Sequence, residues 1–161
     1  MGDYKNFHTV RGYEIIEKEK KTLTHSMEDY LEMIYRISLK DGGVRINILA
    51  HALNVQPPSA TKMVQKLTRL GFINYVKYGA VFLTEKGEKM GKFLLDRHNI
   101  IEEFFRMVGL EKDVLFNIEL MEHNISKDAL SKIEVLNNFF RDNPDVEKGF
   151  HEYKESIKNL E

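Results

Sequence analysis

Cysteine is absent from all 161 residues of the chain. The chain can therefore form no disulfide, no thiolate zinc site and no cysteine nucleophile. Any transition-metal site must be built from carboxylate oxygens and imidazole nitrogens, and these ligands suit Mn(II) or Fe(II) better than softer ions.

Long apolar runs are also missing. No stretch approaches the roughly 20 apolar residues that a membrane span needs. The N-terminal sequence MGDYKNFHTVRGYEII lacks the apolar core of a signal peptide, so we expect a cytoplasmic protein with no membrane partner. With 42% hydrophobic residues, the chain can bury the core of one medium domain or two small ones.

The chain as a whole has no large excess of positive or negative charge, because its net charge is −1. The average hides an asymmetry: residues 57–92 carry seven basic side chains against two acidic ones, whereas residues 102–161 carry fourteen acidic against eight basic. This pattern indicates a nucleic-acid-binding face joined to an acidic region. Solvated charge on two unrelated faces is the alternative.

The first half of the chain reads as a series of short elements. Residues 1–24 are polar, without clear periodicity, and form an N-terminal extension to which no role is assigned. Ser26 is the predicted N-cap of a helix that ends at Asp41-Gly42-Gly43. Two further helices are expected over 45–53 and 58–70, the second with proline in its first turn and Gly71 as its stop.

Two alternating apolar segments follow, 72–78 and 81–84, and they predict a β-hairpin around Gly79-Ala80. Helix, turn, helix and hairpin is the order of a winged helix-turn-helix, whose second helix enters the major groove of DNA. Hydroxyls and backbone amides near the start of that helix can bind phosphate, lysines supply salt-dependent affinity, and Gln65 is the best candidate for reading a base. The predicted DNA contacts are Ser59, Thr61, Lys62, Gln65, Lys66 and Lys77. A plain amphipathic surface helix is the alternative.

The second half of the chain is predicted to be helical. A long helix is expected over 88–108, and two or three more over 112–142, with a break near Asn124-Ile125-Ser126 where the serine can cap the next helix. A charged helix over 146–161 ends the chain.

Metal-capable side chains recur at helical spacing. Glu119, Glu122 and His123 occupy positions i, i+3 and i+4, which share one helix face. The flanking Ile118, Leu120 and Met121 imply that this helix is substantially buried, and buried carboxylates call for a compensating cation. Asp29 and Glu32 show the same i, i+3 spacing upstream, and His98 lies between the two groups.

Each candidate ligand also has a simpler explanation on its own. Asp29 can be the acid of a capping box that stabilises a helix start. His98 can be a surface or core histidine, and Glu119 and Glu122 can be ordinary exposed acids. It is the combination of the residues that favours a divalent metal site.

Several motifs together resemble a known family, in the right order and spacing over residues 25–142. They are Ser26-Met-Glu-Asp29-Tyr-Leu-Glu32, Thr61-Lys-Met-Val-Gln-Lys-Leu67, Leu83-Thr84-Glu-Lys-Gly87, Arg97-His98 and Glu119-Leu-Met-Glu122-His123-Asn-Ile-Ser126. The sequence resembles the manganese transport regulator (MntR) branch of the diphtheria toxin repressor (DtxR) family.

The resemblance implies a mostly α-helical homodimer with an N-terminal winged helix-turn-helix (25–92, with a two-stranded β wing), an all-helical metal-binding and dimerisation domain (93–145) and the C-terminal helix. It also implies a Mn(II)-dependent repressor of manganese-uptake genes that binds double-stranded operator DNA. The residues at the family's metal-ligand positions are Asp29, Glu32, His98, Glu119, Glu122 and His123.

Details of the metal site also follow from the resemblance. Glu32 and Glu122 are expected to bridge two ions per subunit, and the main-chain oxygen of Glu119 adds a contact. Iron-responsive relatives carry methionine and cysteine where this chain has Asp29 and Glu119, so Mn(II) is preferred to Fe(II). One departure is the wing tip, Tyr78-Gly79-Ala80, where the family pattern leads us to expect an arginine.

Three rival functions differ in the chemistry they require. An Fe(II)-dependent repressor of the same architecture is the nearest. A di-metal carboxylate enzyme draws a Glu-x-x-His motif from each of two helices, and this sequence has none, so we expect neither an enzyme nor a small-molecule substrate. A winged-helix protein that uses no metal is the third.

Overall fold

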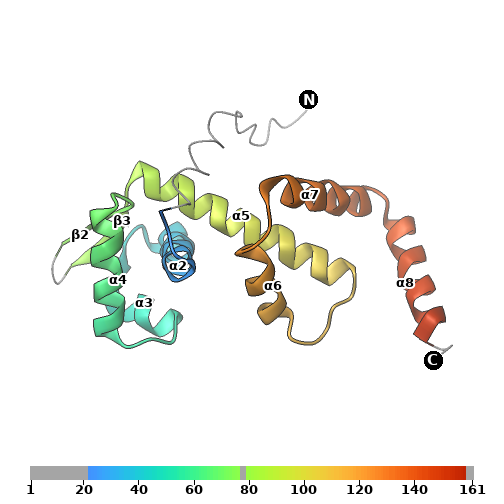
Figure 1. Cartoon of the computed structure of the whole chain (residues 1–161), viewed down its shortest axis with the longest axis horizontal. Helices are drawn as coiled ribbons and strands as arrows, with labels where there is room; N and C mark the ends of the chain where they lie inside the picture. Colours follow the sequence, from blue (N-terminus) through green and yellow to red (C-terminus); the bar gives the residue numbers. More distant parts are fainter. Residues whose placement is uncertain (1–21, 77–78, 159–161) are drawn as a thin grey trace. The chain divides into compact units, whose positions relative to one another are not determined.

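The computed structural model of the chain describes residues 22–76 and 79–158. Helices dominate, and a small antiparallel sheet lies in the N-terminal half (Figure 1). Two compact units divide the chain: the first ends at Leu95 and the second begins at Asp96, within helix α5 (Glu85–Met107). Most of the expected N-terminal extension falls outside the described residues.

Helix α2 (His25–Asp41) begins one residue before the predicted cap. Its N-cap is Thr24, whose hydroxyl accepts a hydrogen bond from the Met27 amide at 3.4 Å. The prediction of Ser26 as N-cap is therefore wrong, because Ser26 already lies in the first helical turn. The end of the helix agrees with the prediction, since Gly42 has a φ of 72° that glycine adopts without steric cost.

The two helices of the helix-turn-helix are α3 (Ile46–Ala52) and α4 (Pro57–Arg69). They pack against one another and against α2. Helix α4 starts on two prolines, whose fixed φ suits a first turn, and Gly71 follows its end with a φ of 78°. Both helices therefore occupy the predicted segments to within one or two residues.

The sheet has three strands, with order β1-β3-β2. Strands β2 (Ile73–Tyr75) and β3 (Ala80–Leu83) form the predicted hairpin. The additional strand, β1 (Val44–Arg45), pairs antiparallel with β3 in the register Val44↔Val81 and Arg45↔Ala80. The wing therefore begins before α3 and not only after α4.

The apolar core of the first unit fixes the wing and α4 relative to α2 and α5. Leu31, Leu67 and Phe72 are fully buried in it. The start of α5 packs directly on the sheet: Thr84 donates a hydrogen bond to the Gly71 carbonyl at 2.7 Å, and a Cβ on Gly87 would lie 1.9 Å from the Phe72 carbonyl oxygen. Only glycine fits this close approach.

In the second unit, α6 (Val114–Glu122), α7 (Lys127–Asp142) and α8 (Pro144–Lys158) follow the C-terminal half of α5. Ser126 accepts a hydrogen bond from the Ala129 amide at 3.3 Å, which confirms it as the N-cap of α7. Ile101 and Ile118 are buried at the centre of a small core. Among the described residues of this unit all regular structure is helical, as expected.

Polar contacts tie α7 and α8 to α5. The buried Asn137 amide donates to the Ile100 carbonyl at 2.9 Å, and the ion pair with Glu103 raises the pKa of Arg141. Lys154 of α8 donates to the carbonyls of Val108 and Gly109 at 3.1 and 2.8 Å, just beyond the end of α5. A cation is favourable there because helix carbonyls point out of the C-terminus.

None of the helices in the described residues has the length and apolar character to cross a membrane.

Candidate metal centre and nucleic-acid interface

Glu122 is the central residue of a polar cluster inside the second unit. It is the last residue of α6, and only 2% of its surface is exposed. Its Oε2 lies 3.1 Å from Nδ1 of His98, which comes from α5. The buried carboxylate of Glu122 and the imidazole of His98 are therefore hydrogen-bonded to one another.

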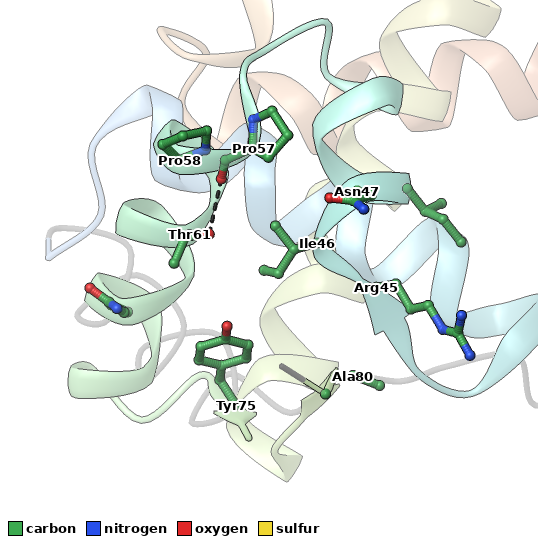
Figure 2. A pocket seen from close by; sticks show the side chains of 11 residues that line it. Arg45, Ile46, Asn47, Pro57, Pro58, Thr61, Tyr75 and Ala80 are labelled. Atoms are coloured by element: carbon green, nitrogen blue, oxygen red, sulfur yellow. Dashed lines mark hydrogen bonds between the residues drawn. The ribbon is translucent and has the colours of Figure 1, made fainter. Parts of the chain in front are cut away.

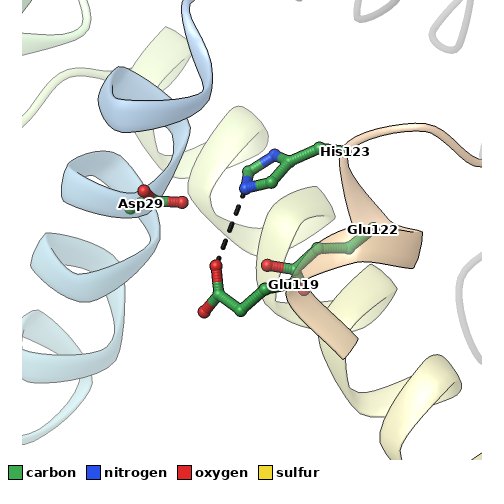
Figure 3. A group of neighbouring side chains, drawn as sticks. All are labelled: Asp29, Glu119, Glu122 and His123. Atoms are coloured by element: carbon green, nitrogen blue, oxygen red, sulfur yellow. Dashed lines mark ion pairs between the residues drawn. The ribbon is translucent and has the colours of Figure 1, made fainter. Parts of the chain in front are cut away.

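Glu119 and His123 lie on the same side of α6, one turn apart. Glu119 Oε2 is 3.7 Å from His123 Nε2 (Figure 3). Glu119, Glu122 and His123 each offer a ligand atom, and these atoms lie within 4.8 Å of one another. The predicted i, i+3, i+4 face is therefore formed, and α5 adds the imidazole of His98 beside it.

The donor set of this cluster fits a divalent metal ion. Oxygen ligands lie about 2.0–2.6 Å from hard divalent cations, so ligands of one ion are at most about 4–5 Å apart. The separations among Glu119, Glu122 and His123 fall within this limit. Two carboxylates and two imidazoles contain no sulfur, which suits hard and borderline ions. A buried carboxylate such as that of Glu122 is also costly without a nearby positive charge.

Asp29 and Glu32 belong to the first unit, where they lie one turn apart on α2. Glu32 is buried, and its Oε1 accepts from Nε of Arg36 at 2.9 Å and pairs with Nη2 of the same residue at 2.7 Å. Arg36 thus holds one of the two carboxylate oxygens of Glu32 in place. Burial raises the pKa of the phenol of Tyr30, which lies next to Asp29 in the sequence.

The side chains predicted to contact DNA are displayed along α4. Ser59, Lys62, Gln65 and Lys66 are exposed, and Thr61 is half-buried. The Thr61 hydroxyl donates to the Pro57 carbonyl at 2.9 Å, so its oxygen can serve a further partner only as an acceptor. Lys77 of the wing lies outside the described residues.

An open groove runs beside α4 (Figure 2). Pro58, Thr61 and Gln65 of α4 line one side of it. Arg45 lies on the opposite side, and Tyr75 of strand β2 in the wing also lines the groove. Arg45 and Tyr75 were not among the predicted contacts. The basic charge of Arg45 was visible in the sequence, but its strand partner, and hence its place at the groove, was not.

Two family models match the chain over nearly all of this structure. Residues 22–81 match "Iron dependent repressor, N-terminal DNA binding domain", and residues 84–151 match "Iron dependent repressor, metal binding and dimerisation domain". The chain thus combines a winged helix-turn-helix with a helical unit that carries a cluster of carboxylates and imidazoles. These matches place it in the class of metal-responsive DNA-binding regulators.

Curated relatives narrow the class further. The chain is 43% identical over 126 residues to the HTH-type transcriptional regulator MntR of Lysinibacillus sphaericus, covering 78% of this chain and 91% of the relative. It is 41% identical over 120 residues to the regulator of the same name from Bacillus subtilis, covering 74% and 84%. The chain belongs to the manganese transport regulator (MntR) branch of the diphtheria toxin repressor family. This is a family of transcriptional regulators, so the expectation that the chain is not an enzyme is confirmed.

Solved structures share the fold. The manganese regulator SloR superposes with a TM-score of 0.61 at 27% identity, over 70% of this chain and 54% of that one. A manganese-dependent transcriptional repressor in complex with manganese gives a TM-score of 0.63 at 26% identity, over 70% and 53%. The chain therefore spans about half the length of these solved relatives.

Proposed function

We propose that the chain is a Mn(II)-dependent repressor that binds operator DNA as a homodimer and controls manganese-uptake genes. The observation that carries the proposal is the buried Glu122–His98 pair beside Glu119 and His123, in the unit that matches a metal-binding and dimerisation domain. The names of the relatives, which are manganese regulators, support the choice of ion. A repressor of this kind acts on DNA in the cytoplasm.

The proposed ligand set is the one implied by the family. It adds the α2 carboxylates of Asp29 and Glu32 to the four residues of the second unit. Glu32 and Glu122 are the proposed bridging carboxylates, the main-chain oxygen of Glu119 is an additional ligand, and two ions bind each subunit. A bound divalent ion supplies the positive charge that buried carboxylates require.

On the DNA side, α4 enters the major groove. Gln65 has the bidentate amide that pairs with adenine, and the acceptor and methyl group of Thr61 face base edges. Lys62 and Lys66 bind phosphate, which gives affinity without sequence preference. Ser59 offers a hydroxyl donor near the start of α4, and Lys77 is a further phosphate contact on the wing.

The proposed ligands belong to both units, and this is how metal binding is coupled to DNA binding. Asp29 and Glu32 lie on the helix that supports the helix-turn-helix, whereas the other ligands belong to the dimerising unit. When both sets share a site, the two α4 helices of a dimer are held at a fixed spacing. Half-sites about one helical turn, ~34 Å, apart are then bound together.

DNA binding with and without Mn(II) tests the proposal directly. A duplex is selected from a randomised pool by the wild-type chain in the presence of Mn(II), and its affinity is measured by fluorescence anisotropy in Mn(II) and in chelator. We expect much tighter binding with Mn(II). Equal affinity in both conditions contradicts the proposal, and so does an unchanged response when Glu119 and His123 are both replaced.

The choice between Mn(II) and Fe(II) needs a separate titration. Both ions are added anaerobically to the same protein and duplex, and the DNA affinity at saturation is compared. We expect stronger activation by Mn(II), because Asp29 and Glu119 stand where iron-responsive relatives carry methionine and cysteine. Stronger activation by Fe(II) favours the iron-dependent alternative.

A further inference from the structure

Arg45 occupies an unusual position at the junction of the wing and the helix-turn-helix. It is the second residue of β1 and also the N-cap position of α3. Its strand partner is Ala80, beside the wing tip. The preceding pair, Val44 and Val81, is fully buried, so strand alternation places Arg45 and Ala80 on the solvent face of the sheet.

The guanidinium of Arg45 has no acidic partner among residues 22–76 and 79–158. Its side chain is exposed, and it makes no capping hydrogen bond to α3. Arginine presents a planar set of donors that matches phosphate oxygens, and it remains charged at any physiological pH. A charged donor group is thus displayed at the rim of the groove without a visible structural role.

The N-terminus of α4 is poorly equipped to bind phosphate with its backbone. Pro57 and Pro58 have no N–H group, and the amides of Ser59 and Ala60 already donate to the Gln56 carbonyl, at 2.9 and 3.2 Å. The backbone amides that usually form an anion site at a helix start are therefore missing or engaged. Phosphate near this end of α4 must be held by side chains.

The groove between these two features has the character of a DNA backbone site. Figure 2 shows Pro58 and Thr61 on one side and Arg45 on the other. None of the described residues that line it is acidic, so none of them repels a phosphate. Exposed Lys62 and Lys66 add positive charge to α4, at the positions next to the lining residues Thr61 and Gln65 in the sequence.

We infer that Arg45 is a phosphate contact and that the side of the groove formed by the β1–β3 pair holds one sugar–phosphate strand of the bound duplex, while Thr61 and Gln65 on the α4 side face the bases. This inference rests on the proposed DNA-binding function. In this arrangement Arg45 supplies, from β1, the cation that the wing tip residue Ala80 lacks. The base-reading face of α4 is then positioned by a contact on its flank.

The salt dependence of DNA binding tests the inference, because each phosphate contact contributes about 0.9 to the slope of log K against log salt. The proteins are wild type, Arg45→Gln and Arg45→Lys, all loaded with Mn(II). The probes are the selected duplex and an unrelated duplex of the same length. We expect Arg45→Gln to lower the slope by about one unit and to weaken both duplexes by the same factor. Arg45→Lys, which keeps the charge, retains the wild-type slope.

Lys132→Gln is the matched control, since Lys132 is an exposed cation of α7 whose ammonium lies 3.9 Å from Asp128. It is expected to leave the slope unchanged. A wild-type slope for Arg45→Gln overturns the inference, and so does a loss confined to the selected duplex, which indicates a base contact. If wild type itself shows no Mn(II)-activated binding, the proposed function fails, whatever the Arg45 variants do.

Discussion

At the scale of single residues, Glu122 is a charged side chain whose burial carries a cost in free energy. Its carboxylate is almost entirely removed from water, and His98 is the partner it contacts within the second unit. A carboxylate in this position is retained only if a positive charge offsets the loss of hydration. The proposed ion meets this requirement, and Glu122 is also one of the two proposed bridging ligands.

Replacing Glu122 by glutamine keeps the shape and removes the charge. We expect Mn(II) affinity to fall by at least about 10–100-fold, the loss typical even for residues that only support a ligand. Folding should be preserved, because the neutral amide is less costly to bury. Isothermal titration calorimetry measures the affinity, and Glu134→Gln, an exposed acid of α7, is the control. Unchanged affinity in Glu122→Gln removes this residue from the site.

At the scale of elements, the joint between the wing and α5 depends on backbone contact. Gly87 leaves no room for a side chain, since an added Cβ would lie 1.9 Å from the Phe72 carbonyl oxygen. In contrast, Gly149 lies within α8, with nothing within 4 Å of its Cβ position. The two glycines therefore respond oppositely to the same substitution.

We expect Gly87→Ala to lower the free energy of unfolding by about 1–3 kcal/mol, because α5 must move away from the backbone of Phe72. Gly149→Ala should raise it by about 0.5–1 kcal/mol, as alanine does at a free helical position. Urea denaturation of both variants measures the difference. A Gly87→Ala protein as stable as wild type is incompatible with this packing.

The same elements show what the sequence alone was able to predict. Periodicity and glycine positions located α3, α4 and the hairpin, because these signals are local. Strand β1 was missed since two residues are too short for an alternating pattern, and only pairing with β3 defines it. Threonine and serine are both favourable N-cap residues, so the sequence did not distinguish Thr24 from Ser26 as the N-cap of α2. The structure shows that the Thr24 hydroxyl accepts from the Met27 amide.

The candidate metal site was predictable for a similar reason. Glu119, Glu122 and His123 are close in sequence, so helical spacing alone placed them on one face. The contact of His98 with Glu122 joins residues 24 positions apart and required the fold of the second unit. The shortage of backbone N–H donors at the start of α4 could also have been predicted, because Pro57 and Pro58 have no N–H group. Backbone amides there were nevertheless expected to bind phosphate.

At the scale of the whole molecule, the second unit displays apolar side chains that a monomer has no reason to expose. On α6, Leu115, Phe116 and Leu120 are more than half exposed. Val135 and Phe139 of α7 are also exposed. Large exposed apolar side chains of this kind mark protein interfaces. The match of this unit to a dimerisation domain identifies a second copy as the expected partner.

A charge on this surface should therefore weaken self-association. We expect Phe116→Glu to raise the dimer dissociation constant at least about tenfold, which corresponds to about 1.4 kcal/mol. Sedimentation equilibrium measures the constant. Leu39→Glu is the control, because Leu39 is equally exposed, at 63%, but belongs to the first unit. An unchanged constant in Phe116→Glu excludes α6 from the interface.

Metal and DNA binding must also influence one another to the same extent. If Mn(II) tightens DNA binding by a given factor, thermodynamic linkage requires DNA to tighten Mn(II) binding by that factor, typically about 5–150-fold. The coupling arises only if ligands from both units share the ion, so Asp29→Asn should reduce both factors together. Calorimetric titration of Mn(II), with and without a saturating selected duplex, gives one factor, and anisotropy gives the other. If Mn(II) activates DNA binding by Asp29→Asn as strongly as it does for wild type, α2 takes no part in the coupling. The proposed link between the metal site and α4 is then wrong.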